Sequence, residues 1–278
     1  MNRRDVWAGL AGVALGGGGV FAASRVGAEL AGSAPDRLVL HSERVGRDFL
    51  IEVTPPAGPL PLGRRLPIVY ALDAGYHVAA AEALALQASG AMAPAYVVAI
   101  GYPPGQPNMR ETDLLHRPHI DGGASHGGGG AAFEAFILDE LRPAIEARYP
   151  VDPARAILLG HSLAGLFVVN MLADRPQAFR AYLMASPSIW ADPQAITRVR
   201  AAAPRGRGRL VFLTVGGAET PRMRQGVDAL RTVLTAPAST FVLHSRTFPG
   251  QVHMSYYPAF VEAALTDALP PGAPRAGR

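Results

Sequence analysis

The chain contains no cysteine and no lysine, and these two absences exclude several kinds of chemistry. Without cysteine there is no disulfide, no thiol nucleophile and no thiolate metal site. Without lysine there is no Walker A loop, no Schiff base with pyridoxal phosphate and no Ser-Lys dyad. A covalent nucleophile, if the protein uses one, must therefore be Ser, Thr, Asp, Glu, His or Tyr.

Charged residues are also few. They make up 17% of the 278 residues, whereas 49% are hydrophobic, and this balance is typical of one large packed domain rather than a disordered chain. The formal net charge is +4, and every basic residue other than histidine is an arginine. Because the arginines are scattered rather than clustered, the composition argues against a nucleic-acid partner. It does not indicate an oligomeric state.

Residues 1–28 have the pattern of an export signal. Arg3 and Arg4 precede an uncharged run over 6–24, which is glycine-rich and too short and weakly apolar for a membrane span of about 20 residues. Paired arginines before such a run are typical of a twin-arginine signal. We therefore expect a periplasmic or secreted protein with no stable membrane insertion after the signal is removed. An uncleaved N-terminal anchor is the alternative.

The remaining chain alternates short apolar runs with helical patterns, which predicts an α/β fold with a doubly wound, mostly parallel sheet. The expected strands are 37–41, 48–53, 66–72, 96–101, 156–159, 181–185, 210–215 and 240–245. The expected helices are 131–148, 163–175, 221–233 and 257–269. The first two strands, joined by a short link, predict an antiparallel N-terminal edge.

We expect a single domain over 29–270 and a flexible tail over 271–278. The segment 101–130 has no clear periodicity, and a loop of this length within a compact domain is usually functional or mobile.

The stretch Gly160-His161-Ser162-Leu163-Ala164 nearly spells G-x-S-x-G, the turn that presents a nucleophilic serine between a strand and a helix. Small residues are needed two places before and two places after the serine, because the strand and the helix pass close together. Ala164 adds one methyl group where the pattern has glycine. The backbone amide of Leu163, at the helix N-terminus, is a candidate oxyanion donor.

A serine hydrolase with this turn places an acid and then a histidine later in the chain. Glu219 follows the expected strand 210–215, where such an acid belongs, and Asp228 is its rival inside a helical pattern. His253, in a loop before the last helix, is the candidate base. His244 lies within a strand pattern and reads as a packed or surface residue, whereas His161 is expected to pack in the turn.

The second oxyanion donor is expected in the loop after strand 66–72, where Gly75 permits close backbone approach. Asp73 is expected to hold this loop by hydrogen bonds. His116, His119 and Asp121 could imitate a metal site, but three ligands on one loop are weak evidence for a metal. We predict no metal and no cofactor.

Three stretches together resemble the enterochelin-esterase-like branch of the Putative esterase family, α/β-hydrolases that include siderophore trilactone hydrolases. The stretches are FEAFILDELRPAIEARYPVDPARAILLGHSLAGLFVV, RPQAFRAYLMASPSIWAD and GQVHMSYYPAF. The ordered combination of G-H-S, S-P-S-x-W and H-x-S-x-x-P is specific, whereas each motif alone is not. The resemblance covers about residues 37–270, and it departs from the family pattern at Ala74 and Ala164.

The resemblance implies an α/β-hydrolase fold and a serine carboxylic-ester hydrolase that forms an acyl-enzyme. Ser162 would be the nucleophile, His253 the base and Glu219 the acid, with Gly75 and Leu163 as oxyanion donors. Arg110 and Trp190 would flank the substrate, although each also fits a structural role.

The implied partner is a small-molecule ester, such as a siderophore trilactone. Two alternatives are an exported acyltransferase of the same fold, revealed by alcohols that compete with water, and a non-catalytic ligand-binding scaffold.

Overall fold

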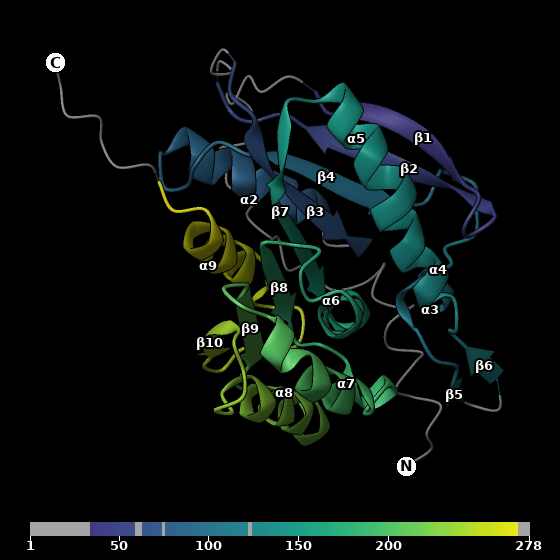
Figure 1. Ribbon diagram of the computed structural model, residues 1–278, viewed down its shortest axis with the longest axis vertical. Coiled ribbons are helices and arrows are strands. Elements are labelled where there is room, and N and C mark those ends of the chain that lie inside the picture. The colour runs from purple at the N-terminus through teal and green to yellow at the C-terminus, as the bar shows by residue number, and fades with distance from the viewer. Residues whose placement is uncertain (1–33, 59–62, 74–75, 122–123, 272–278) are drawn as a thin grey trace, which may run out of the picture. The chain divides into compact units, whose positions relative to one another are not determined.

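The computed structural model describes residues 34–58, 63–73, 76–121 and 124–271 (Figure 1). The chain divides into two units, Met1–Ala31 and Gly32–Arg278, and the first lies wholly outside the described residues. The expected export signal and all but the first residue of the expected tail lie outside them too. Within the described ranges, no helix is long and apolar enough to cross a membrane.

One eight-stranded sheet runs through the second unit in the order β1-β2-β4-β3-β7-β8-β9-β10. The strands are β1 Asp36–Ser42, β2 Arg47–Thr54, β3 Leu66–Leu72, β4 Tyr96–Gly101, β7 Val151–His161, β8 Ala181–Ala185, β9 Leu210–Gly216 and β10 Val242–Phe248. The pairings from β4 through to β10 are parallel, while β1 and β2 run antiparallel. The predicted mostly parallel sheet with an antiparallel N-terminal edge is confirmed.

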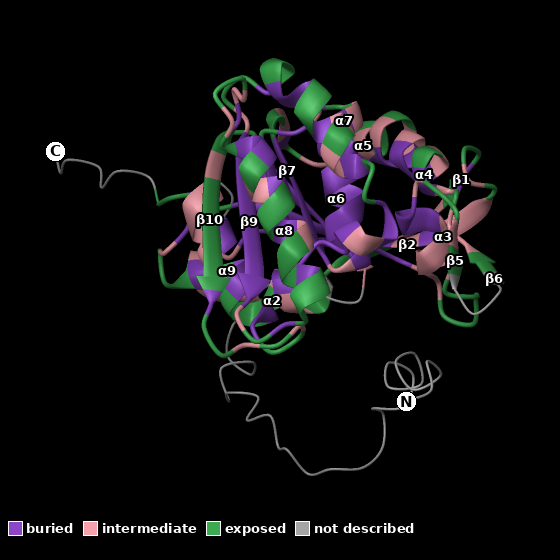
Figure 2. Ribbon diagram, turned by 90° about the horizontal axis from the view of Figure 1, so that it is seen from below, coloured by how far each residue is buried: buried purple, intermediate pink, exposed green. Residues whose placement is uncertain are grey.

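Helices cover both faces of the sheet (Figure 1). They are α2 Tyr76–Ala88, α3 Arg110–Leu114, α4 Gly130–Ala135, α5 Arg142–Arg148, α6 Leu163–Asp174, α7 Ala195–Ala202, α8 Pro221–Leu234 and α9 Tyr257–Ala268. Alternate strand residues point to opposite faces, so Tyr70 of β3 packs in one apolar layer and Ala71 in the other. α2 and α9 share the layer of Ala71, and α6 and α8 share the layer of Tyr70. Figure 2 shows that α6 is almost entirely buried while the edge strand β10 is exposed.

The predicted helix 131–148 is present, but its middle part, Phe136–Leu141, is a π-helix between α4 and α5. β7 begins at Val151, earlier than expected, because Val151 pairs with Leu66 of β3. The register then shifts, and the pairing resumes between Ile68 and Ala156. β10 lies at 242–248 rather than 240–245, since its pairing with β9 runs from Leu210 to Gly216.

The segment 101–130 is more ordered than its sequence suggests. It contains the short helix α3 and a hairpin of β5 (His119–Asp121) and β6 (Ala124–His126). Asp113 of α3, whose side chain is fully buried, accepts hydrogen bonds from Arg47 at 2.7 and 2.8 Å and from Tyr102 at 3.0 Å. These contacts tie the segment to the antiparallel edge of the sheet.

Candidate active site

Ser162 lies in a sharp turn between the end of β7 and the start of α6. Its φ of 60° and ψ of −118° belong to a region that residues with side chains rarely occupy. Neighbouring backbone holds it there: its N–H donates to Ala185 O at 3.0 Å, and its carbonyl accepts from Ser188 N–H at 3.0 Å and Leu166 N–H at 2.9 Å. The turn therefore has the geometry expected of a nucleophile elbow.

Two glycines make this turn possible. A Cβ at Gly160 would lie 2.4 Å from the carbonyl oxygen of Ala164, and a Cβ at Gly165 would lie 2.9 Å from Ala185 O and 3.1 Å from Pro187 Cα. Ala164 itself is fully buried at the second position of α6. The closest backbone approaches thus fall on residues 160 and 165, and the methyl group of Ala164 is accommodated.

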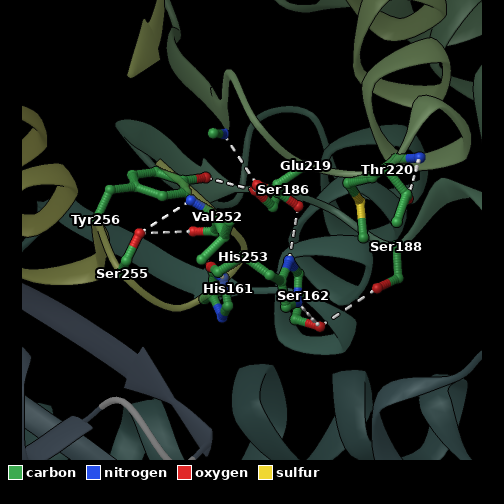
Figure 3. Close-up of polar contacts among 12 residues, drawn as sticks. His161, Ser162, Ser186, Ser188, Glu219, Thr220, Val252, His253, Ser255 and Tyr256 are labelled. Atoms are coloured by element: carbon green, nitrogen blue, oxygen red, sulfur yellow. Dashed lines mark hydrogen bonds and ion pairs between the residues drawn. The ribbon is translucent and has the colours of Figure 1, made fainter. Parts of the chain in front are cut away.

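Three residues predicted from the sequence meet at this turn (Figure 3). His253 Nε2 lies 2.9 Å from Ser162 Oγ, and His253 Nδ1 lies 2.8 Å from Glu219 Oε2. Glu219 comes from the loop between β9 and α8, and its side chain is 2% exposed; His253 precedes α9, and its side chain is 32% exposed. A hydroxyl, an imidazole and a carboxylate in this order can pass the hydroxyl proton to the imidazole.

Glu219 is set up to remain ionised. Burial alone would raise its pKa, but hydrogen bonds from His253, the Ser186 hydroxyl and the Gly216 N–H outweigh burial and hold the pKa below its ordinary value. A carboxylate can only accept hydrogen bonds, so in the neutral imidazole the proton of His253 sits on Nδ1. Nε2 is then left to accept from the Ser162 hydroxyl.

His161 packs in the turn, as predicted, and it also contacts the loop that carries the base. Its Nε2 donates to the carbonyl oxygen of His253 at 2.8 Å, and the two rings lie 4.5 Å apart. Burial, followed by the repulsion that His253 exerts when its ring is protonated, lowers the pKa of His161 to about 4. At neutral pH His161 is therefore uncharged and supports the backbone of His253.

Two serines in the motif S-P-S-x-W belong to this site, although sequence reasoning singled out only its tryptophan. Ser188 Oγ lies 3.4 Å from Ser162 Oγ, and the Ser186 hydroxyl bonds to Glu219 and to Tyr256 (Figure 3). Both serines follow β8, whose C-terminal end adjoins the end of β7. Their position directly after a buried parallel strand was the signal that could have identified them.

The predicted oxyanion donors fall in different parts of the chain. Leu163 is the first residue of α6, directly after Ser162, and the first N–H groups of a helix have no partner within the helix. This geometry is consistent with the predicted donor. Gly75 and its neighbour Ala74 lie outside the described residues.

Arg110 binds Asp73, which follows the end of β3. Its Nε lies 2.9 and 3.0 Å from the two carboxylate oxygens, and its Nη2 makes a further short bond to Oδ2. The side chains are 30% and 10% exposed respectively. The guanidinium is thus held by a carboxylate, and α3 is tied to the end of β3.

Trp190 lies two residues beyond Ser188, in a short 3₁₀ turn at Ile189–Ala191. The guanidinium of Arg222 lies 4.9 Å from its ring centroid, and the ring of His119 meets it edge-on at 5.4 Å. Trp190 is therefore half-buried within a cationic and aromatic surface on the β8 side of Ser162. Arg110 lies on the other side, next to β3.

The other acidic and histidine candidates lie away from this site. Asp228 is exposed on α8 and pairs with Arg231, and His244 Nδ1 lies 2.7 Å from Asp267 Oδ2 on the surface. These positions agree with the preference for Glu219 and His253.

The three predicted ligand-like residues of the 116–121 segment do not form one set. His116 lies 3.4 Å from Glu134 and 3.9 Å from Asp174, whereas His119 contacts Trp190, and the side chain of Asp121 is outside the described part of the chain. Glu134 and Asp174 also pair with Arg175 at 3.2 Å and Arg198 at 3.7 Å. These guanidinium groups already balance the carboxylates that a cation would need.

A doubly wound, mostly parallel sheet with a serine elbow after a central strand defines the α/β-hydrolase fold. Residues 42–270 match the family model described as "Putative esterase", and the chain belongs to this esterase family. The protein is accordingly an ester hydrolase. The family resemblance seen in its motifs is confirmed.

Two named relatives and one solved structure are similar to this chain. The chain is 30% identical to the ferri-bacillibactin esterase BesA of Bacillus subtilis over 261 residues, which are 85% of this chain and 90% of the relative. It is 36% identical to the siderophore triacetylfusarinine C esterase of Aspergillus fumigatus over 172 residues, 56% of each chain. The crystal structure of the BES protein from Bacillus cereus superposes with a TM-score of 0.76 at 25% identity, over 85% of this chain and 95% of that one.

Proposed function

We propose that the protein is a serine carboxylic-ester hydrolase that works through an acyl-enzyme. The observation that carries this proposal is the hydrogen-bonded series Ser162–His253–Glu219, with distances of 2.9 and 2.8 Å. His253 Nε2 takes the proton of Ser162, whose oxygen attacks the ester carbonyl. The amides of Leu163 and Gly75 stabilise the oxyanion, and Glu219 stabilises the imidazolium.

The same groups complete the formation of the acyl-enzyme and then catalyse its hydrolysis. The imidazolium of His253 protonates the leaving alcohol, the acyl group remains on Ser162, and a water molecule is then deprotonated by His253 and attacks the acyl-enzyme. The carboxylic acid leaves and Ser162 regains its proton.

For the substrate, we propose a siderophore trilactone or a similar polyester. The names of the two relatives, esterases of ferri-bacillibactin and of triacetylfusarinine C, support this class. The surface made by Trp190, Arg222 and His119 can bind an aromatic or anionic part of such a molecule, since a cation and a ring lie face to face. Arg110 contributes less free positive charge, because Asp73 holds its guanidinium.

The site of action that we propose is the periplasm or the outside of the cell. The support for it is the paired arginine signal at the N-terminus.

Replacement of the nucleophile tests the reaction. We expect Ser162→Ala to lower the turnover of a short-chain p-nitrophenyl ester by about 10⁴-fold or more and to abolish labelling by a fluorophosphonate, with an unchanged melting temperature. Ser245→Ala on the exposed strand β10 is the matched control. Wild-type turnover by the Ser162→Ala variant would contradict the mechanism. Hydrolysis of ferric bacillibactin at no better rate than the simple ester would contradict the substrate.

A further inference from the structure

The tripeptide Ser186-Pro187-Ser188 touches both ends of the Ser162–His253–Glu219 series. It directly follows β8, and two backbone hydrogen bonds bind it to the nucleophile turn: Ser162 N–H donates to Ala185 O, and Ser188 N–H donates to Ser162 O, each at 3.0 Å. Ser186 and Ser188 are 0% and 1% exposed. Their hydroxyl groups are therefore fixed in place beside the reacting groups.

The hydroxyl of Ser186 has a single possible direction for its proton. Glu219 is a carboxylate and only accepts, so Ser186 must donate to Glu219 Oε1, and the hydroxyl of Tyr256 must donate to Ser186. Burial raises the pKa of Tyr256 to about 12, so Tyr256 keeps that proton at neutral pH. Ser186 also has a positive φ of 40°, and its N–H donates to Thr214 O at 2.9 Å. The fold holds the strained backbone of Ser186 in place, and the Ser186 hydroxyl orients the carboxylate of Glu219.

The hydroxyl of Ser188 meets the nucleophile from another direction. Ser162 gives its own proton to His253 Nε2, so its oxygen offers only lone pairs to other neighbours. Ser188 Oγ, 3.4 Å away, must then be the donor of that contact. A donor at this place restrains the Ser162 side chain and stabilises the negative charge that develops on Oγ as the proton leaves.

Pro187 makes the tripeptide rigid. A Cβ at Gly165 would lie only 3.1 Å from the Cα of Pro187. The tripeptide therefore packs directly on the first turn of α6. The proline ring also restricts the backbone between the two serines.

We propose that these two serines are working parts of the active site, with Ser188 as a catalytic donor to the nucleophile and Ser186 as a positioning residue that acts through Glu219. The proposal rests on the proposed function, since it takes Ser162 as the nucleophile. It adds two residues beyond the series of serine, histidine and acid.

The test compares Ser186→Ala and Ser188→Ala in the full chain, each alone and combined with Glu219→Gln. Ser89→Ala is the control, because that hydroxyl donates to Leu86 O at 3.0 Å at the end of α2, outside the site. The measurements are the rate of fluorophosphonate labelling and the kcat and KM for a p-nitrophenyl ester. They are made well below the lowest melting temperature in the set.

We expect Ser188→Ala to lower kcat and the labelling rate by about 10- to 100-fold at unchanged KM, the usual range for a hydrogen bond to a charged group. This loss should be the same with Glu219 or Gln at position 219. Ser186→Ala should lower kcat about 10-fold in the wild-type background, but should cost nothing further in Glu219→Gln, because it acts through that side chain.

Wild-type rates in Ser188→Ala would show that Ser188 only packs in the site and takes no part in catalysis. An equal loss from Ser186→Ala in both backgrounds would exclude action through Glu219. Either result leaves the proposed function intact. A wild-type chain that is not labelled at Ser162 would overturn the proposed function and this proposal with it.

Discussion

Among the described residues, the three that have a side chain and a positive φ share one location. Asp73, Ser162 and Ser186, with φ of 65°, 60° and 40°, each directly follow one of the neighbouring strands β3, β7 and β8. Such conformations cost about 1–3 kcal/mol each and persist only where the surrounding structure holds them. Backbone strain is therefore concentrated at the carboxyl ends of the central strands, where the candidate site lies.

At the same scale, the departure of Ala164 from the elbow pattern has a measurable consequence. We expect Ala164→Gly to change kcat less than about twofold and to destabilise the protein by about 1 kcal/mol or less, since glycine costs about that much within a helix. Gly160→Ala should lose at least about 10-fold in kcat, because its Cβ would lie 2.4 Å from Ala164 O and force the turn open. Ester turnover and thermal unfolding of both variants measure this. A large gain of activity in Ala164→Gly would mean that the methyl group distorts the site.

At the scale of elements, the ion pair between Arg110 and Asp73 ties α3 to the end of β3 beside the predicted oxyanion loop. If the pair positions that loop, Arg110→Ala and Asp73→Ala should each lower kcat for a neutral ester about 10-fold, and the double variant should lose no more than either alone. We expect this result, because Asp73 already binds the guanidinium at 2.9 and 3.0 Å.

The readout that separates positioning from substrate binding is the charge of the ester. A loss confined to anionic esters, with a raised KM in Arg110→Ala and none in Asp73→Ala, would instead make Arg110 a substrate-binding residue. Arg44→Ala, which breaks an exposed pair with Asp139, is the control.

An element could be predicted from the sequence where its surroundings are regular along its whole length. Strands such as 66–72 and 181–185 match the structure fully, because both faces are buried and the apolar runs end abruptly. α2 is rich in alanine, and its polar residues His77, Glu82 and Gln87 do not gather on one face, so it has no helical periodicity to detect, while the first part of β7 is only partly buried after Val151 and contains Pro153. The helix α2 and the first part of β7 depend on packing and strand pairing, which no local sequence pattern indicates.

The candidate site follows the same rule. Ser162, Glu219 and His253 could be found from their order along the chain and their positions after strands. The position of Ser186 and Ser188 directly after a strand could mark them as candidates, but their roles could not be predicted, because these depend on the contact between β7 and β8. The pairing of Arg110 with Asp73 likewise joins residues 37 positions apart.

At the scale of the whole molecule, the free energy of unfolding should depend on pH through His161. In the folded protein the pKa of His161 is lowered to about 4, against an ordinary value of 6.5. Between these two values the unfolded chain binds a proton that the folded protein does not. The stability that the neutral His161 contributes is therefore fully present above about pH 6.5, and it is lost as the pH drops toward 4. The difference corresponds to roughly 3 kcal/mol.

Urea unfolding of the wild type and of His161→Asn at pH 7, 6, 5 and 4 measures this dependence. Asparagine keeps an N–H donor near the His253 carbonyl but does not titrate, so the variant should lose roughly 3 kcal/mol less than the wild type from pH 7 to pH 4. Titrating groups that do not interact with His161 contribute equally to both proteins. Ser245→Ala, at an exposed position of β10 that carries no titrating group, should keep the wild-type dependence. Parallel curves for wild type and His161→Asn would mean that His161 is protonated without cost, and that the burial of its ring beside His253 does not control acid stability.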